Sequence, residues 1–232
     1  MTPQSNTERF RGSSEIPLTD AGVDGARTLA MQLASKGGLD EIHTSDLGRT
    51  VHTSRIISHY THAPIVYAGQ GLHPWHLGQL EGQPITPDSL ALQRSLILDT
   101  PDASIPGRGP LSTADGESFN SFKDRTIPKL QELIGKVSTD PTRRIGVVTH
   151  YRVKKLLDSW MRAGMDPSGA IDPQEMVSHN DSSRPGSIER LTVDPAAGAQ
   201  MHSVDLSSPG QLGGGLYILR HEKTPWNASF GS

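Results

Sequence analysis

A chain of 232 residues can bury one large core or two small ones, and its net charge of −3 predicts no broad nucleic-acid surface. No apolar run reaches the length of a membrane span, and the first residues lack the basic-then-apolar pattern of a signal peptide. The absence of cysteine excludes disulfides and thiolate metal sites. We therefore expect a cytoplasmic protein with neither a membrane nor a nucleic-acid partner.

Hydrophobic periodicity and turn residues predict an alternation of helices and strands. In chain order we expect a helix over 20–36, a strand over 39–44, a helix over 47–60, a strand over 65–67, helices over 87–99 and 119–136, a strand over 144–149, a helix over 153–162, strands over 187–193 and 200–206, and a last strand over 216–220. Residues 100–116 are rich in Pro and Gly, which predicts a surface loop that acts as a lid. We expect residues 164–187 to be irregular. This alternation predicts a mostly parallel sheet with helices on both faces.

Helix-start signals place one arginine in an unusual position. Thr19 is suited to cap the first helix, and Ser45-Asp46 to cap the second. The second cap places Arg49 in the first helical turn, where a positive charge is unfavourable to the helix dipole. Arg49 therefore indicates an anionic partner, although surface arginines are common.

Histidine follows two of the predicted buried strands. His150 comes after the strand at 144–149, and the last strand ends in Arg220-His221. If these strands are neighbours, both histidines converge with Arg49 and Arg220 at one sheet edge, where helix amides add further donors. Guanidinium groups match phosphate oxygens in geometry and charge, and a neutral imidazole can attack phosphorus. The pattern favours a phosphoryl site in which the arginines keep the nucleophile neutral.

The less specific interpretations stay open for single residues. A histidine at one strand end, such as His150, is more often a hydrogen-bonded structural residue than a catalyst. No metal-ligand spacing such as His-Glu-x-x-His occurs. Five other histidines are predicted as surface residues: His43, His52, His59, His62 and His179.

Five segments form a joint pattern that is more specific than any one of them. They are Arg220-His221-Glu222-Lys223-Thr224-Pro225-Trp226-Asn227; Arg9 to Gly22; Ser45, Leu47, Arg49 and Thr53; Gly116-Glu117-Ser118 with Arg125; and Val147-Val148-Thr149-His150. Together they resemble the motifs of the histidine phosphatase superfamily, also called phosphoglycerate-mutase-like. The first resembles the family's opening Arg-His-Gly-x-Thr-x-x-Asn. The resemblance implies a three-layer α/β/α fold with a mostly parallel central sheet.

The order of these segments differs from the family's order, because the family's first strand is here the last. We interpret this as a circular permutation within a single domain over 1–232. Residues 194–215 would join the family's old ends, and 216–227 would supply the permuted first strand and catalytic loop. The permutation requires the strand at 216–220 to lie beside the strand at 144–149, with His221 facing His150. Five residues follow Asn227 and eight precede Arg9, and this spare length at the chain ends also permits a strand-swapped dimer. Monomer and homodimer therefore both stay open.

The resemblance also implies residue roles. His221 would be the nucleophile that forms a phosphohistidine, and Arg220, Arg49 and His150 would bind the phosphoryl group. Asn227 and Thr224 would contact phosphate or support its loop.

Two positions depart from the family pattern. Glu222 replaces a glycine next to the phosphate site, and Pro74 replaces the glutamate that serves as proton donor. Proline cannot deliver a proton, so nearby loops must supply the donor or the site lacks one. The candidates are His76, Glu81 and Glu117.

These features predict a metal-independent phosphomonoester hydrolase without a cofactor, acting on a small phosphorylated substrate. A phosphoglycerate-mutase-like phosphotransferase is an alternative, which Pro74 argues against. A non-catalytic protein that binds a phosphate ligand is the other alternative, which Glu222 and Pro74 favour.

Overall fold

The computed structural model describes residues 9–107, 115–178, 186–194 and 198–221. The described strands form one six-stranded sheet in the order β2-β1-β3-β6-β4-β5. Their bounds are β1 Glu41–Thr44, β2 Ile65–Tyr67, β3 Arg144–Thr149, β4 Ile188–Asp194, β5 Gly198–Ser203 and β6 Gly215–Arg220. The α-helices are α1 Asp20–Ser35, α2 Gly48–Thr61, α3 Pro87–Leu98, α4 Phe119–Thr139, α5 Tyr151–Arg162 and α6 Pro173–Ser178, with 3₁₀ turns at Gly69–Leu72 and Gly78–Leu80.

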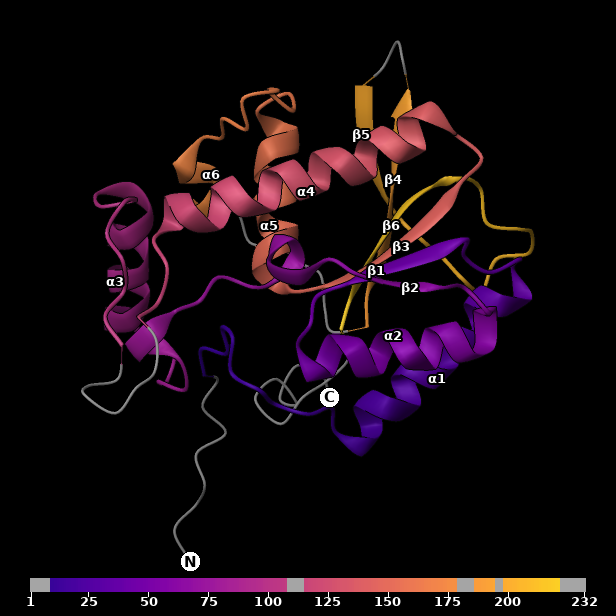
Figure 1. The fold of residues 1–232 in the computed structure, drawn as a ribbon, viewed down its shortest axis with the longest axis horizontal. Helices are drawn as coiled ribbons and strands as arrows, with labels where there is room; N and C mark the ends of the chain where they lie inside the picture. The colour runs from indigo at the N-terminus through magenta and orange to yellow at the C-terminus, as the bar shows by residue number, and fades with distance from the viewer. Residues whose placement is uncertain (1–8, 108–114, 179–185, 195–197, 222–232) are drawn as a thin grey trace, which may run out of the picture.

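The last strand of the described chain lies inside the sheet. β6 pairs in parallel with β3, and Arg220 is in register with Thr149. On its other side β6 pairs antiparallel with β4, which pairs antiparallel with β5 (Figure 1). The predicted position of the 216–220 strand beside the 144–149 strand is confirmed, and four of the six strands form a parallel set.

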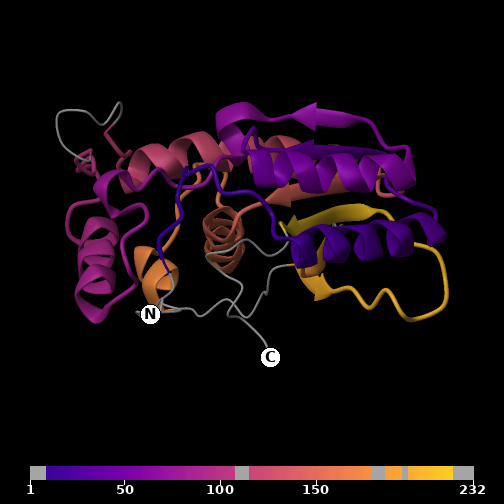
Figure 2. The ribbon, with the colours of Figure 1, turned by 90° about the horizontal axis from the view of Figure 1, so that it is seen from below.

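The two faces of the sheet carry separate hydrophobic cores. α1 and α2 cover one face, where Leu33 and Ile57 pack against Leu219. α4 and α5 cover the other, where Leu130 and Leu156 belong to a larger core (Figures 1 and 2). Every residue of β6 is buried, which explains why this strand reads as a continuous apolar run. The predicted three-layer arrangement is confirmed.

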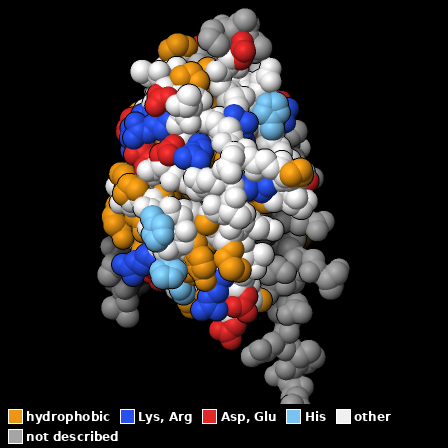
Figure 3. All heavy atoms as spheres, turned by 90° about the vertical axis from the view of Figure 1, so that its right-hand side faces the viewer, with side chains coloured by type: hydrophobic (Ala, Val, Ile, Leu, Met, Phe, Trp, Pro, Cys, Tyr) orange, Lys and Arg blue, Asp and Glu red, His pale blue; other side chains and the backbone are white. Residues whose placement is uncertain are grey.

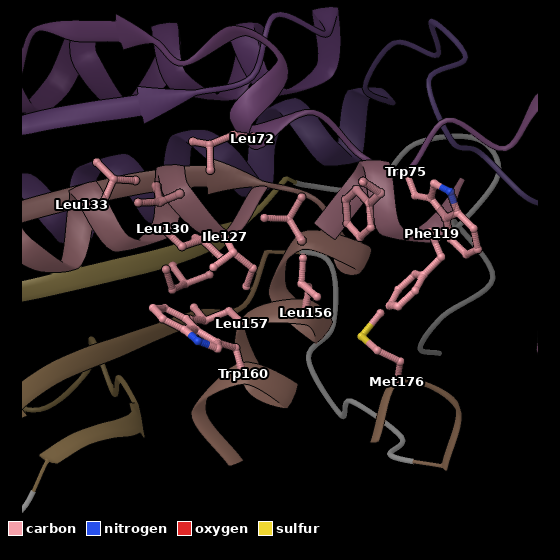
Figure 4. Close-up of a cluster of buried hydrophobic side chains, with 14 of the residues drawn as sticks. Leu72, Trp75, Phe119, Ile127, Leu130, Leu133, Leu156, Leu157, Trp160 and Met176 are labelled. Carbon is pink, nitrogen blue, oxygen red and sulfur yellow. The ribbon is translucent and has the colours of Figure 1, made fainter. Parts of the chain in front are cut away.

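The larger core continues beyond the sheet into the loop that precedes α3. Trp75 is completely buried, and its ring lies 5.7 Å from that of Phe119 at the start of α4. Figure 4 shows both rings near Met176 of α6. α3 contacts α6 through Arg94 and Gln174, at the end of the molecule away from α1 (Figure 2). The loop over 72–82 is thus held by core packing rather than exposed to solvent.

Three local predictions are wrong. The stretch at 164–187 contains α6, a short helix whose Met176 is buried in the core. α5 begins at Tyr151, earlier than expected, because His150 takes the N-cap position. Leu47, without a side-chain hydrogen bond, caps α2 instead of Ser45-Asp46.

The prediction that His43 lies on the surface is also wrong. Its side chain is fully buried, and its Nε2 lies 3.1 Å from Glu41 Oε1. The reason is that all four residues of β1 are buried, because β1 lies between β2 and β3 and is covered on both faces. Burial is the largest cause that lowers the pKa of His43, and Glu41 opposes it.

Within the described ranges, no helix combines the length and the apolar character needed to cross a membrane. Figure 3 shows one face of the molecule, on which acidic, basic and histidine side chains are interspersed with hydrophobic ones. This mixture agrees with the small net charge of the chain.

Candidate active site

The fold brings His150 and His221 together at the carboxyl ends of two neighbouring strands. Their ring centroids are 5.4 Å apart, with an angle of 59° between the rings. The backbone N–H of His221 donates to the Thr149 carbonyl at 3.3 Å, so the β3–β6 pairing extends to the histidine itself. Both residues are only 3% exposed. The predicted facing of His221 and His150 within the chain is confirmed.

Ser45 positions the His150 ring. Ser45 Oγ lies 2.8 Å from His150 Nε2 and 2.7 Å from Thr50 Oγ1. Ser45 follows β1 and is fully buried, which explains why it contacts the site rather than capping α2. When Ser45 donates its proton to Nε2, the Nδ1 atom carries the proton of the neutral ring and can donate it to a ligand.

Arg49 approaches from the first turn of α2 and is 1% exposed. Its Nη1 and Nη2 atoms donate to the carbonyls of Ser14 at 2.7 Å and Gly12 at 2.9 Å. Burial lowers the pKa of Arg49 to about 10, while Glu15 and Glu81 raise it. The guanidinium group therefore stays charged at neutral pH. Glu15 also accepts a hydrogen bond from the Gly48 backbone N–H at 3.0 Å, at the start of the helix.

Two buried polar atoms of this site have no hydrogen-bond partner among the described residues. They are Arg49 Nε and His150 Nδ1. Unpaired polar atoms are rare in protein interiors, because each costs about 1–3 kcal/mol of desolvation. The Arg49 Nε–H is a donor, and His150 Nδ1 is a donor in the tautomer in which Ser45 donates to Nε2, so both atoms can bind the oxygens of an anion.

His150 is held neutral by its surroundings. Burial is the main cause that lowers its pKa well below the usual value, and the charges of Arg49, His221, His73 and Arg11 lower it further. An unfolded histidine binds a proton below a pH of about 6.5, whereas the folded His150 does not. The folded state therefore loses stability as the pH falls through this value.

We expect His150→Gln to weaken this pH dependence. The wild type should lose up to about 1.4 kcal/mol of unfolding free energy through His150 between neutral pH and pH 5.5, and the variant should lose correspondingly less. Urea unfolding at several pH values measures the slope. Equal slopes for the two proteins would show that His150 is not buried in its neutral form.

Arg220 is buried as well, with 7% exposure, and its Cζ lies 5.1 Å from the centre of the Tyr151 ring. It therefore adjoins the residue that follows His150. The other residues predicted in the Arg-His loop, Glu222, Thr224 and Asn227, lie outside the described residues.

The predicted proton-donor candidates are engaged in holding loops. Glu81 accepts hydrogen bonds from the Ser13 backbone N–H at 2.7 Å, Ser14 Oγ at 2.8 Å and the Leu77 N–H at 3.1 Å. His76 Nε2 lies 3.8 Å from Glu81 Oε1, and the His76 side chain is 30% exposed. Glu81 thus ties the loop over 72–82 to the loop that carries the acceptors of Arg49.

Glu117 forms an ion pair with Arg125, whose Nε donates to Glu117 Oε2 at 2.8 Å. Its other oxygen accepts from the His76 backbone N–H at 3.0 Å. Arg125 also donates to the carbonyls of His73 at 3.0 Å and Pro74 at 2.8 Å. This pair therefore holds the start of the 72–82 loop in place.

Two further residues of this neighbourhood were not predicted from the sequence. His73 and Arg11 each lie close enough to lower the pKa of His150. Pro74 at the family's donor position is the one signal that points to its neighbour His73. No sequence signal singled out Arg11, which follows Phe10 in a turn-rich segment.

Comparisons with known proteins agree with this geometry. The sequence profile of the histidine phosphatase superfamily (branch 1) matches residues 1–175. The "Probable phosphoglycerate mutase GpmB" of Serratia proteamaculans is 32% identical over 136 residues, which cover 57% of this chain and 59% of that protein. The matches cover 55 to 64% of the length of the first curated relatives, so the chain spans about three-fifths of them.

Solved structures share the fold at low sequence identity. A mycobacterial glucosyl-3-phosphoglycerate phosphatase in complex with inorganic phosphate is 18% identical with a TM-score of 0.59, covering 89% of this chain and 94% of that one. An alpha-ribazole phosphatase from Shigella flexneri is 17% identical with a TM-score of 0.57, covering 88% and 91%. With the profile match over most of its length, this chain belongs to the histidine phosphatase superfamily.

Proposed function

We propose that this protein is a phosphomonoester hydrolase that works through a phosphohistidine on His221. The observation that carries the proposal is that two buried polar atoms, Arg49 Nε and His150 Nδ1, have no partner among the described residues, while the His150 ring lies 5.4 Å from that of His221. Phosphoryl oxygens accept from a guanidinium N–H, and they accept from a neutral His150 when its proton is on Nδ1.

In the proposed reaction the His221 imidazole attacks phosphorus. A P–N bond forms while the P–O bond of the ester breaks, and the leaving oxygen takes a proton. Water then attacks the phosphohistidine, and the electron pair of the P–N bond returns to the imidazole. Arg49 and His150 stabilise the charge that gathers on the phosphoryl oxygens in both steps. Arg220, Thr224 and Asn227 are further proposed phosphate contacts.

A mutase would have to retain its phosphohistidine until the product rebinds in a second orientation. Curated relatives carry mutase names, and solved neighbours carry phosphatase names, so the relatives alone leave both reactions open. The chain has Pro74 where the family's donor glutamate stands, which argues against the mutase. We therefore favour hydrolysis of a small phosphate ester.

Turnover of p-nitrophenyl phosphate with and without EDTA tests the proposal. We expect release of phosphate in both conditions and an acid-labile phosphate on the protein after rapid quenching. An assay with a phosphorylated sugar acid separates the mutase from the hydrolase. Binding of phosphate esters in calorimetry without any turnover would instead favour a phosphate-binding protein and contradict hydrolysis.

We also infer that the order of segments reflects a circular permutation. β6 lies between β3 and β4, and the family profile matches 1–175, a range that does not include β6. The segment before β6 is exposed over 207–211, and exposed loops tolerate a change of chain ends. A rearranged chain that starts at Gly210, continues from Ser232 into Met1 and ends at Pro209 should therefore fold and keep its turnover. A rearranged chain that fails to fold would contradict the inference.

A further inference from the structure

A third histidine lies beside the two of the proposed site. His73 follows Leu72, whose carbonyl accepts a hydrogen bond from Thr149 Oγ1 at 3.3 Å. Thr149 is in turn the residue before His150 and the backbone partner of His221. The His73 backbone is thereby fixed at the carboxyl end of β3, next to both site histidines.

The His73 ring lies between two segments that hold the site. Its Nδ1 lies 3.4 Å from Ser13 Oγ, and its Nε2 lies 3.5 Å from Asp46 Oδ1. Ser13 stands between Gly12 and Ser14, whose carbonyls accept from Arg49. Asp46 follows Ser45, which contacts His150. The His73 side chain is therefore surrounded by direct chain neighbours of the groups that position Arg49 and His150.

The contacts of this ring are long, and the side chain keeps 11% of its exposure. Nδ1 has one further contact, with the Pro74 carbonyl at 3.4 Å. Contacts of 3.4–3.5 Å are weak, so either nitrogen can exchange its partner for a ligand oxygen at little cost. Glu81 and Glu117, by contrast, each accept several hydrogen bonds shorter than this.

We propose that His73 is the general acid that protonates the leaving group, which rests on the proposed hydrolysis through His221. In the first step the P–O bond breaks and the leaving oxygen takes the proton from the His73 imidazolium. In the second step the neutral His73 takes a proton from the water that attacks the phosphohistidine. His73 thus ends the cycle protonated, and the donor that Pro74 cannot supply comes from the preceding residue.

The charges around His73 set the pH at which it holds its proton. Burial is the main cause that lowers its pKa, and Arg125 and Arg49 lower it further. Asp46 and the Pro74 carbonyl raise the pKa of His73. His150 lies close enough that the charge of His73 lowers the pKa of His150. A phosphate ester adds negative charge and raises the pKa of His73 when it binds. We therefore expect the best turnover of poor leaving groups on the acidic side of neutral pH.

The test compares an alkyl phosphate, glycerol 3-phosphate, with p-nitrophenyl phosphate, whose leaving group needs little protonation. His73→Gln should lower kcat for the alkyl ester by about 10²-fold and for the aryl ester by less than about threefold. The loss of rate at high pH with the alkyl ester should also disappear. His59→Gln, at an exposed histidine of α2, serves as the matched control and should change neither rate. His73→Asn replaces His73→Gln if the latter does not fold.

Other outcomes overturn the inference in distinguishable ways. An equal loss on both esters would make His73 a binding or structural residue. A selective loss on the alkyl ester in His76→Gln, and none in His73→Gln, would assign the proton to His76. If the wild type turns over neither ester, the proposed hydrolysis itself fails, and the role of His73 fails with it.

Discussion

His221→Ala is expected to lower kcat for p-nitrophenyl phosphate by about 10⁴-fold or more and to abolish acid-labile phosphate on the protein. The reason is that the proposed P–N bond forms on the His221 imidazole, which alanine lacks. His150 is the neighbouring imidazole, but its Nε2 contacts Ser45 at 2.8 Å, and it sits at the helix start rather than at the end of β6. Loss of a nucleophile has effects of this size in enzymes that depend on one.

The fold should survive this substitution. His221 contributes its backbone N–H to the Thr149 carbonyl, and alanine keeps that bond. Equal thermal unfolding of the variant and the wild type checks this. His202→Ala, at an exposed histidine of β5, is the matched control and should keep full turnover. Normal turnover by His221→Ala would refute the phosphohistidine mechanism.

The position of His221 is also where the sequence was most informative. β3 and β6 are short apolar runs that each end next to a histidine, and glycines precede β6. Such runs need little tertiary information to be recognised. Their parallel pairing follows from the expectation that strands separated by helices lie in one sheet. Because the register joins Thr149 to Arg220, the two histidines that follow meet at one edge.

The contacts that complete the site could not be predicted in this way. Ser45 precedes a helix, and serine is a residue type that often caps helices. Its hydroxyl nevertheless contacts His150, which is 105 residues away in the chain. His43 is a polar residue on a short strand, and only the neighbours of β1 on both sides show that it is buried. These choices are made by tertiary packing, which overrides local propensity.

His73 illustrates the same limit at the site itself. Its ring meets Ser13 and Asp46, which come from two segments well separated from it in the chain. In the family motif the proton-donor glutamate stands at position 74, and the proline found there indicates that the site lacks this donor. Only the arrangement of three loops shows that the imidazole of the preceding residue, His73, lies close to His150.

Arg49→Met is the second substitution with a large expected effect. We expect kcat/KM for p-nitrophenyl phosphate to fall by about 10²–10³-fold, because a preorganised donor next to the transferring group is lost. The affinity for inorganic phosphate, measured by calorimetry, should fall as well. Arg49→Lys keeps the charge but loses the fork of donors, so we expect a smaller loss than in Arg49→Met.

The matched control is Arg144→Met, at the opposite end of β3. Arg144 donates to Asp40 and to the Gly37 carbonyl, far along the strand from His150, so its loss should leave phosphate affinity and turnover unchanged. If the turnover of Arg144→Met were as low as that of Arg49→Met, the loss of activity in Arg49→Met would not be specific to the proposed phosphate site.

A purely structural role of Arg49 could also explain a loss of activity in the variant, because Arg49 donates hydrogen bonds to the Gly12 and Ser14 carbonyls. Loss of these hydrogen bonds should cost about 1–3 kcal/mol of unfolding free energy, partly offset because a buried charge is removed. A purely structural arginine would therefore lower stability while the folded fraction still binds phosphate normally. An arginine that binds the phosphoryl group lowers phosphate affinity even at temperatures where the variant is fully folded. The unpaired Nε atom at 1% exposure leads us to expect the second result.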